Sequence, residues 1–183
     1  MAAPVRTPRE AWVKAGLSAL SAGGPDAVRV EALAKALGVT KGGFYWHFTD
    51  RDALLEAMLD SWEQRLVDQA VAVADGSGGS ARSRLRRLFG FAGDNPALMD
   101  LELAVRDWGR RSPSVAQRVR RVDDRRLGYL RPLFAEFCDG PADVEGRCLL
   151  VLTLFVGSPA VGASHPGRTR AQAETAAVRH LLR

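Results

Sequence analysis

Residues 30–48 constrain the fold more than any other part of the sequence, because two short helical patterns there meet at a tight corner. Apolar side chains recur at helical spacing over residues 30–37, which predicts a helix with one buried face. Gly38 follows, and glycine readily takes the left-handed conformation in which many helices end. Thr40 is a good N-cap residue and predicts a further short helix over residues 41–47. The segment is therefore predicted to be a helix-turn-helix.

The predicted helix over residues 41–47 separates its side chains into two sets. Phe44 and Phe48 are four residues apart and are expected to point inward, against the preceding helix. Lys41 and Tyr45 share a different face, where an ammonium and a phenol can contact phosphate oxygens. The positive end of the helix dipole favours the same kind of anionic partner.

Gly42 and Gly43 stand inside this short predicted helix, where each glycine costs about 1 kcal/mol relative to alanine. Close approach of the backbone to a DNA strand is one explanation, since a side chain would hold the two surfaces apart. The alternative is that the segment is a loop or a turn of 3₁₀ helix.

The rest of the chain also has helical patterns, and no segment is predicted as a strand, so an all-α fold of about nine helices is expected. Capping-box motifs at Thr7, Thr49 and Thr169 mark helix starts. Pro132 is expected to bend or break the helix that contains it. Besides the two helices above, the predicted helices cover residues 8–21, 51–74, 81–92, 96–109, 113–137, 144–161 and 170–182.

Composition and charge exclude some classes of protein and favour others only weakly. The net charge of +5 favours an anionic partner, but a solvated arginine-rich surface explains it equally well. Cys138 and Cys148 lack zinc-type spacing and are expected to be buried thiols. None of the three histidines has a carboxylate or cysteine at catalytic or metal-ligand spacing, so we expect no metal, no cofactor and no enzymatic activity. The N-terminus lacks the apolar core of a signal peptide, and the longest apolar run is too short to span a bilayer, so we expect a cytoplasmic protein without a membrane partner.

The run ALAKALGVTKGGFYWHF at residues 32–48 closely resembles the DNA-binding signature of TetR/AcrR-type transcriptional regulators, and TDRDALL at residues 49–55 resembles it as well. The resemblance covers about residues 7–60. It implies a helix-turn-helix DNA-binding domain over residues 1–50. It also implies a helical effector-binding and dimerisation domain over residues 51–183, whose first helix connects the two domains.

The resemblance also implies a function. The chain is expected to be a ligand-responsive regulator that binds double-stranded DNA at a palindromic operator as a homodimer. Family habit favours a repressor that a small-molecule effector of unknown identity releases, by shifting the dimer between two states. An activator of the same fold, or a helical small-molecule-binding protein that has lost operator binding, is the alternative. The residues implied in DNA binding are Arg29, Thr40, Lys41, Gly42, Gly43, Tyr45, Trp46, His47 and Arg51.

Three positions near the predicted DNA-binding face allow two interpretations each. Arg29 stands where the family often places a serine or threonine cap; arginine cannot cap a helix in that way, although it can reach a phosphate. Glu31 can accept a hydrogen bond from a cytosine amine or lie solvated, and the solvated side chain is the commoner case. Trp46 can flank the DNA backbone or cover the helix pair.

The last two predicted helices are the candidates for a dimer interface. Residues 144–161 are apolar nearly all round, which predicts burial on most sides, either in a dimer or at the centre of a monomeric domain. The resemblance favours a four-helix dimer interface. The expected interface residues are Leu149, Leu152, Phe155, Val156, Ala176, Val178 and Leu181.

The middle helices are expected from the resemblance to enclose a ligand pocket, although simple core packing explains the same residues. Trp12 and Trp62 are expected to be core residues rather than contacts to a partner. The expected pocket residues are Met99, Leu103, Arg106, Trp108, Leu130 and Phe134.

Overall fold

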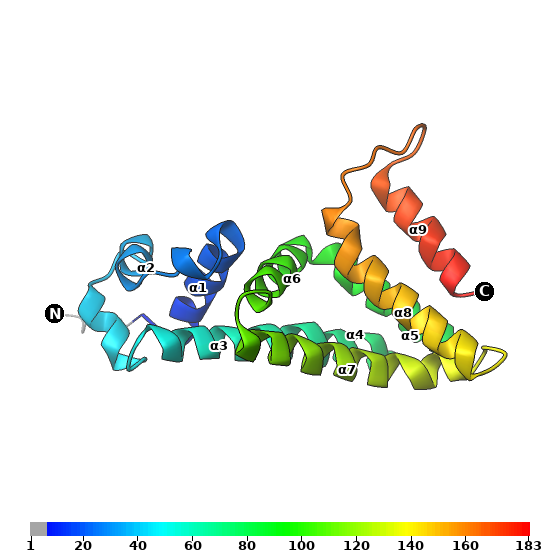
Figure 1. Ribbon diagram of the computed structural model, residues 1–183, viewed down its shortest axis with the longest axis horizontal. Coiled ribbons are helices and arrows are strands. Elements are labelled where there is room, and N and C mark those ends of the chain that lie inside the picture. Colours follow the sequence, from blue (N-terminus) through cyan, green and yellow to red (C-terminus); the bar gives the residue numbers. More distant parts are fainter. Residues whose placement is uncertain (1–6) are drawn as a thin grey trace. The chain divides into compact units, whose positions relative to one another are not determined.

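Helices form the regular secondary structure in the computed structural model, which describes residues 7–183 (Figure 1). No strand occurs within this described range, so the predicted all-α class is confirmed. The nine α-helices of these residues are α1 (Arg9–Gly23), α2 (Val30–Ala36), α3 (Arg51–Glu63), α4 (Ala70–Asp75), α5 (Ala81–Asp94), α6 (Pro96–Gly109), α7 (Pro113–Ala135), α8 (Pro141–Gly157) and α9 (Arg170–Leu181). Shorter helical segments are the 3₁₀ helices η1 (Pro25–Ala27), η2 (Lys41–Trp46) and η4 (Ser158–Ala160), and the π-helix η3 (Gln64–Gln69).

The chain packs into two compact units, each made of two separate stretches. The first unit joins the described residues up to Arg65 to the segment Leu101–Val119. The second unit joins Leu66–Asp100 to Arg120–Arg183. Helices α6 and α7 therefore contribute residues to both units. The functional boundary after residue 50 stays a prediction, because these units are defined by packing.

The core of the first unit lies between α1 and α3. Trp12 and Leu20 of α1, and Leu54 and Met58 of α3, have no exposed side-chain surface. Gly16 allows close approach of the two helices, because a Cβ at this position would lie only 2.5 Å from the sulfur of Met58. Helix α2 packs against α1, and η2 packs against α2. The pair of α1 and α3 is thus the frame on which the corner and η2 are mounted.

A buried polar network, which was not predicted from the sequence, joins α3 to α6 within the first unit. The indole Nε1 of Trp62 donates to Glu102 Oε2 at 3.0 Å, and Arg106 Nε donates to Oε1 at 2.6 Å. The Glu102 side chain is only 1% exposed. Because a buried carboxylate is costly without partners, these donors are what make Glu102 tolerable there. Trp62 is a core residue as expected.

Arg118 joins α7 to α3 within the first unit. Its Nη1 donates to Asp60 Oδ1 at 2.7 Å and to Glu63 Oε1 at 2.9 Å. Its Nη2 donates to Glu56 Oε2 at 2.5 Å. The three acceptors follow one another along α3, so a single guanidinium holds most of that helix face.

Of the predicted capping boxes, the first is wrong and the third is confirmed. Helix α1 begins at Arg9, its N-cap position is Pro8, and no side chain caps it. Thr7 instead contributes its carbonyl oxygen to a contact with a histidine described below. At the start of α9, Thr169 Oγ1 accepts from the Gln172 N–H, and the Gln172 side chain accepts from the Thr169 N–H.

The long helix predicted over residues 51–74 is present but differs in two details. Its N-cap is Asp50, whose carboxylate accepts from the Ala53 N–H at 2.8 Å, so the start predicted at Thr49 is one residue early. The π-helix η3 interrupts the α-helical winding between α3 and α4. A π-helix accommodates one extra residue in a turn and is often found at functional sites.

Pro132 does not break the helix in which it lies. Helix α7 continues past it to Ala135. A proline inside a helix costs about 3 kcal/mol. The neighbouring side chains of Leu130, Leu133 and Phe134 are almost fully buried in the core of the second unit, and this packing offsets the cost.

That core gathers residues of α5, α7, α8 and the end of α9, with Leu85 and Phe134 completely buried. The buried thiol predicted for Cys148 is confirmed, and burial raises its pKa to about 11. Cys138 is only partly buried.

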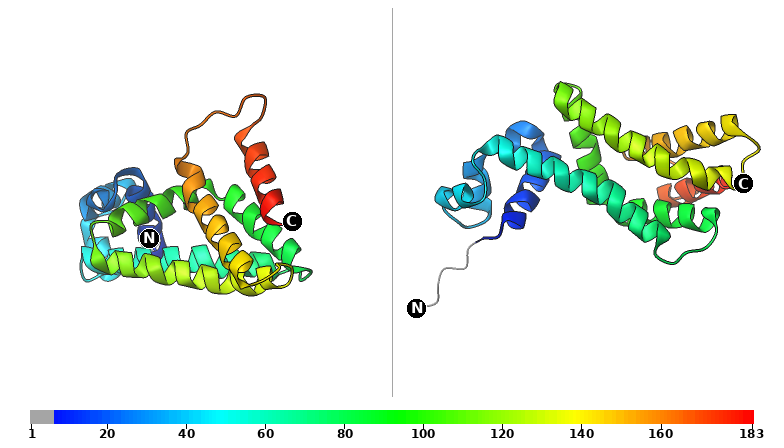
Figure 2. Two further views of the ribbon diagram at one scale, coloured as in Figure 1. Left: turned by 45° about the vertical axis from the view of Figure 1, so that its right-hand side comes forward. Right: turned by 90° about the horizontal axis from the view of Figure 1, so that it is seen from below.

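Helices α8 and α9 leave much of their apolar surface uncovered within one chain. Only three side chains of α8 are buried, and none of α9 is. Leu149 and Leu150 are 60% and 56% exposed. The loop 161–169 between the two helices stands clear of the other helices of its unit (Figure 2). Burial of residues 144–161 on most sides would therefore require a further partner.

Candidate nucleic-acid interface

The corner between α2 and η2 has the geometry that its glycine predicts. Gly38 has a φ of +67°, which L side chains rarely adopt, so the left-handed helix exit is confirmed. The Val39 N–H donates to Ala34 O at 3.0 Å and closes the end of α2. Thr40 is extended and occupies the N-cap position of η2, but its side chain makes no capping hydrogen bond. The predicted position of Thr40 is right and its predicted cap is absent.

The segment Lys41–Trp46 is a 3₁₀ helix, which is the alternative to the α-helix predicted for it. Phe44 is fully buried, in edge-to-face contact with Trp12 at 5.4 Å and stacked on Phe48 at 5.3 Å. The inward direction predicted for both phenylalanines is therefore confirmed. With Phe44 as the anchor, Tyr45 and Trp46 remain 55% and 70% exposed. Both interpretations of Trp46, contact with the DNA backbone and cover for the helix pair, stay predictions.

The two glycines of η2 have no internal reason to be glycine. A Cβ on Gly42 would come no closer than 3.7 Å to the Thr40 hydroxyl, and one on Gly43 no closer than 3.8 Å to Trp12. Neither residue has a positive φ. Since neither packing nor backbone conformation demands glycine, an external surface that approaches this backbone closely is the remaining physical explanation.

Lys41 and Glu31 form an ion pair across the corner, which was not predicted. The Lys41 ammonium donates to Glu31 Oε1, and the two side chains are 50% and 67% exposed. The hydrogen bond from Lys41 lowers the pKa of Glu31, and the same bond raises the pKa of Lys41. The two interpretations of Glu31 given above were a hydrogen bond to a base and a solvated side chain. Neither of them included this ion pair.

His47 and Arg51, both predicted phosphate contacts, make contacts with the chain's own backbone. His47 Nε2 lies 2.8 Å from Thr7 O. Arg51 Nε donates to Val28 O at 2.7 Å, and its Nη2 donates to Pro25 O. Arg51 thereby ties the start of α3 to the turn that precedes α2. A guanidinium carries five N–H donors, so a phosphate contact by Arg51 stays a prediction alongside this role.

Arg29 is exposed and does not cap α2, as its side-chain chemistry predicts. Its Nε donates to Asp26 O at 3.1 Å, within the turn between α1 and α2. The structure thus brings exposed Arg29, Lys41, Tyr45 and Trp46 onto one helix-turn-helix whose buried side faces α1.

The six residues predicted to line a ligand pocket lie on α6 and α7, and their role as ligand contacts stays a prediction. The first unit holds Leu103, Arg106 and Trp108, and the second holds Met99, Leu130 and Phe134. Arg106 is paired with Glu102, and Phe134 is at the centre of the hydrophobic core. Of the six, Leu130 lines the cavity described next and Met99 lines the more open groove.

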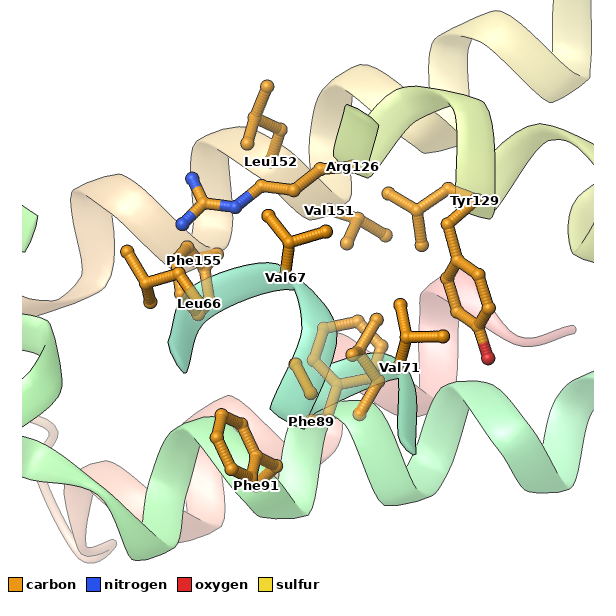
Figure 3. Close-up of a pocket in the computed structure, with 13 residues that line it drawn as sticks. Leu66, Val67, Val71, Phe89, Phe91, Arg126, Tyr129, Val151, Leu152 and Phe155 are labelled. Atoms are coloured by element: carbon orange, nitrogen blue, oxygen red, sulfur yellow. The ribbon is translucent and has the colours of Figure 1, made fainter. Parts of the chain in front are cut away.

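A cavity of about 50 Å³ lies within the second unit, with walls from η3, α4, α5, α7 and α8 (Figure 3). Val67, Phe89 and Phe155 are typical of its almost wholly apolar lining. Arg126 and Tyr129 bring the polar side-chain groups. A more open groove of about 950 Å³ runs between α5, α8 and α9 and is lined by charges of both signs. No local sequence pattern predicted the cavity, because its walls come from five separate segments.

The residues predicted for a dimer interface differ in exposure. Leu149 is mostly exposed, whereas Leu152 and Phe155 line the cavity. Val178 and Leu181 of α9 pack against the core of the second unit and are partly buried. Two more predicted interface residues are partly buried: Val156 and Ala176. Their role in an interface stays a prediction.

The described residues offer neither a metal site nor a membrane-spanning helix. Within residues 7–183, no three or more His, Cys, Asp or Glu side chains are grouped so that they could hold a metal ion. None of the helices in this range is both long enough and apolar enough to cross a bilayer.

Comparison with known proteins relates the helix-turn-helix to one family. Residues 13–58 match the family described as bacterial regulatory proteins, tetR family. The match contains most of α1, all of α2, the corner and η2, and the first part of α3. The resemblance noted from residues 32–55 is therefore confirmed. No curated protein matches the sequence closely enough to count as a relative.

Solved structures share the fold over nearly the whole chain. A TetR-family transcriptional regulator from Streptomyces coelicolor has a TM-score of 0.76 and 22% identity, covering 95% of this chain and 93% of its own. A transcriptional regulator from Rhodococcus sp. Rha1 has a TM-score of 0.71 and 20% identity, covering 96% and 92%. A bacterial regulatory protein in the tetR family from Rhodococcus RHA1 has a TM-score of 0.70 and 19% identity, covering 95% and 94%. At these identities the likeness establishes the fold.

Proposed function

Because residues 13–58 match the tetR family of bacterial regulatory proteins, we propose that the chain is a ligand-responsive repressor of transcription that binds a palindromic operator as a homodimer. It acts in the cytoplasm and by binding alone, without catalysis. The observation that carries this proposal is the outer side of η2. There, exposed Tyr45 and Trp46 flank a backbone whose two glycines leave it bare.

The chemistry of that surface fits a DNA duplex. Lys41 supplies a positive charge and Tyr45 a hydroxyl, both of which contact phosphate oxygens in protein–DNA complexes. The glycine backbone of η2 allows its amides to approach a strand within contact distance. Because such contacts release counterions, affinity should fall steeply as salt rises.

Dimerisation supplies the second half of the operator contact. The uncovered apolar surface of α8, with Leu149 and Leu150 mostly exposed, supports a second copy of the chain as its partner. Two-fold pairing of helix-turn-helix proteins places two reading segments roughly 34–36 Å apart, in successive major grooves. The cavity of the second unit supports an effector site. A ligand there releases DNA by binding more tightly to a state of the dimer in which the distance between the two reading segments does not match the operator.

The test is to enrich duplexes that the purified protein retains from a random pool, and then to measure binding of the selected sequence. Tyr45→Ala and Lys41→Ala should weaken binding at least tenfold with little change in melting temperature. Lys14→Ala removes an exposed lysine of α1 and is the matched control. A pool that yields no selected sequence, or an affinity independent of salt, would contradict DNA binding.

Sedimentation tests the dimer separately. The protein should sediment as a dimer at the concentrations at which it binds the selected duplex. Binding as a monomer to a single half-site would overturn this part of the proposal and leave the DNA contact in place.

A sharp fall in melting temperature for Tyr45→Ala would show instead that this side chain belongs to the core.

A further inference from the structure

The cavity of the second unit has walls that select for the chemistry of a ligand. Its thirteen lining residues are aliphatic or aromatic except Arg126, and Tyr129 adds one hydroxyl (Figure 3). No carboxylate is among these described lining residues. A cation that entered would lie beside the Arg126 guanidinium, whose charge Asp123 already balances, and would itself stay unpaired in an apolar wall, which makes a cationic ligand unfavourable.

The charge of Arg126 is already balanced by a neighbour. Its Nη1 donates to Asp123 Oδ1 at 3.2 Å, and the Arg126 side chain is 10% exposed. The guanidinium carbon lies 4.7 Å from the centre of the Phe155 ring, which holds the group against the apolar wall. An anionic ligand would add a net negative charge to this arginine–aspartate pair in apolar surroundings, so an anion is also disfavoured.

Tyr129 adds a polar group that stays uncharged. Its hydroxyl donates to Asp75 Oδ1 at 2.6 Å. Burial, together with this bond, raises the pKa of Tyr129 to about 12. The cavity therefore presents the guanidinium of Arg126 as its N–H donor group, in a wall that is otherwise hydrophobic.

We propose that this cavity binds an uncharged, largely hydrophobic molecule whose carbonyl-type oxygen accepts a hydrogen bond from Arg126. This inference rests on the proposed function, because it assigns the chemical class of the effector. A guanidinium has five N–H donors, so an added acceptor can share it with Asp123. Apolar burial supplies the affinity, and the acceptor fixes the orientation of the ligand.

The cavity must enlarge when such a molecule binds. Its volume of about 50 Å³ is close to that of one or two waters. The α5 wall is suited to yield, because Gly90 lies between the lining residues Phe89 and Phe91, and space is open where its Cβ would be. A glycine inside a helix lowers helix stability by about 1 kcal/mol. The π-helix η3, which provides Leu66 and Val67, is a second irregular wall.

The experiment compares four probes of similar size by ligand-observed NMR titration of the full chain. Acetophenone carries a neutral carbonyl, ethylbenzene no acceptor, benzoate a negative charge and benzylammonium a positive charge. We expect acetophenone to bind about tenfold more tightly than ethylbenzene, since a hydrogen bond from a charged donor adds to the same apolar burial. Benzoate and benzylammonium should bind more weakly than ethylbenzene.

Three variants locate the binding. Val71→Phe fills the cavity and should reduce acetophenone binding at least tenfold. Val73→Phe makes the same change at an exposed position of α4 and is the matched control. Arg126→Met keeps the apolar stem and should make acetophenone bind no better than ethylbenzene. Melting temperatures of all variants show whether each is folded, and Val71→Leu is a smaller filling change if Val71→Phe is not.

Several results would overturn the inference: tightest binding of benzoate or benzylammonium, no binding of any probe, or equal binding by the Val71 and Val73 variants. Anisotropy of the selected duplex separates this inference from the proposed function. If acetophenone binds as expected but the protein retains no DNA, the proposed function fails and the cavity assignment stands. If DNA is retained and no probe binds, the cavity assignment alone fails.

Discussion

The ammonium of Lys41 donates a hydrogen bond to the carboxylate of Glu31, ten residues earlier in the chain, and so binds an anion of the protein itself. A phosphate that reaches Lys41 must share the ammonium with Glu31 or displace it. Exposed ion pairs contribute little to stability, so a duplex can break this one. The Glu31 carboxylate nevertheless lowers the affinity for any polyanion, because every duplex competes with it for Lys41.

Replacing Glu31 should therefore raise the affinity for duplex DNA of any sequence. We expect Glu31→Gln to raise the affinity for random-sequence duplex about threefold. It should also steepen the dependence of log K on log salt by roughly one, the contribution of one further phosphate contact. Glu136→Gln makes the same charge change at an exposed site in the second unit and should do neither. Identical salt slopes for the two variants would show that Glu31 does not restrain Lys41.

Gly42 distinguishes a role in folding from a role in binding. A Cβ at this position meets nothing closer than 3.7 Å, so Gly42→Ala should leave the free energy of unfolding unchanged or raise it by about 0.4–1 kcal/mol. The same methyl group should hold η2 away from a DNA strand and weaken binding at least tenfold. Gly128→Ala, inside α7 and with open space at its Cβ, should stabilise without affecting binding. Undiminished DNA affinity of Gly42→Ala would remove the reason given for its glycine.

Glu102 should be one of the most sensitive positions for stability. Glu102→Ala leaves the Trp62 indole and the Arg106 guanidinium without this acceptor, and loss of one partner of a buried charge pair costs about 3–5 kcal/mol. Glu102→Gln keeps an acceptor for Trp62 and should cost clearly less. Urea unfolding followed by tryptophan fluorescence measures both values. A loss below about 1 kcal/mol for Glu102→Ala would mean that water replaces the carboxylate there.

Asp75 should give the second unit a stability that depends on pH. Its Oδ1 accepts from the Tyr129 hydroxyl at 2.6 Å and from Arg84 Nε at 2.8 Å, and these bonds lower the pKa of Asp75. A lowered pKa in the folded state stabilises the protein above the unfolded value of about 3.9, and this gain disappears as pH falls through the folded value. Because Asp75 is partly exposed, solvent screening limits the gain to about 1 kcal/mol or less.

The corresponding measurement is urea unfolding of the protein and of Asp75→Asn at several pH values. The variant should be the less stable protein at pH 7, and the difference should shrink as pH falls below the unfolded value of about 3.9. Asp94→Asn, an exposed aspartate at the end of α5, is the control. A difference that persisted unchanged at pH 3 would show that the Asp75 charge contributes nothing.

The helix-turn-helix was predictable from sequence because its determinants are local. Helical spacing over residues 30–37, the left-handed Gly38 and the inward Phe44 all depend on residues close together in the chain. The winding of η2 and η3 was not predictable in the same way. Helices with 3₁₀, α or π hydrogen bonds differ by one residue in register, and apolar spacing over six residues barely distinguishes them.

Long-range partners explain most of what the sequence pattern missed. Glu102 and Trp62 are 40 residues apart, and Arg118 and Glu56 are 62 apart. No periodicity indicates that such residues meet, because their contact depends on how separate helices pack. The predicted pocket residues lay on helices of the right kind, but which helix faces enclose a cavity is decided by that same packing.

The composition of the first unit has a consequence for building hybrid regulators. A DNA-binding segment cut after Arg65 and fused to the effector-binding part of another regulator would lose Leu101–Val119. It would therefore lose Glu102, which accepts from the Trp62 indole, and Arg118, which binds three carboxylates of α3. The fused protein would keep three α3 carboxylates that repel one another and a Trp62 indole N–H without its acceptor. Transfer of DNA specificity to another regulator of this fold therefore requires both segments of the first unit. The alternative is to redesign the receiving protein at the positions that correspond to Glu102 and Arg118.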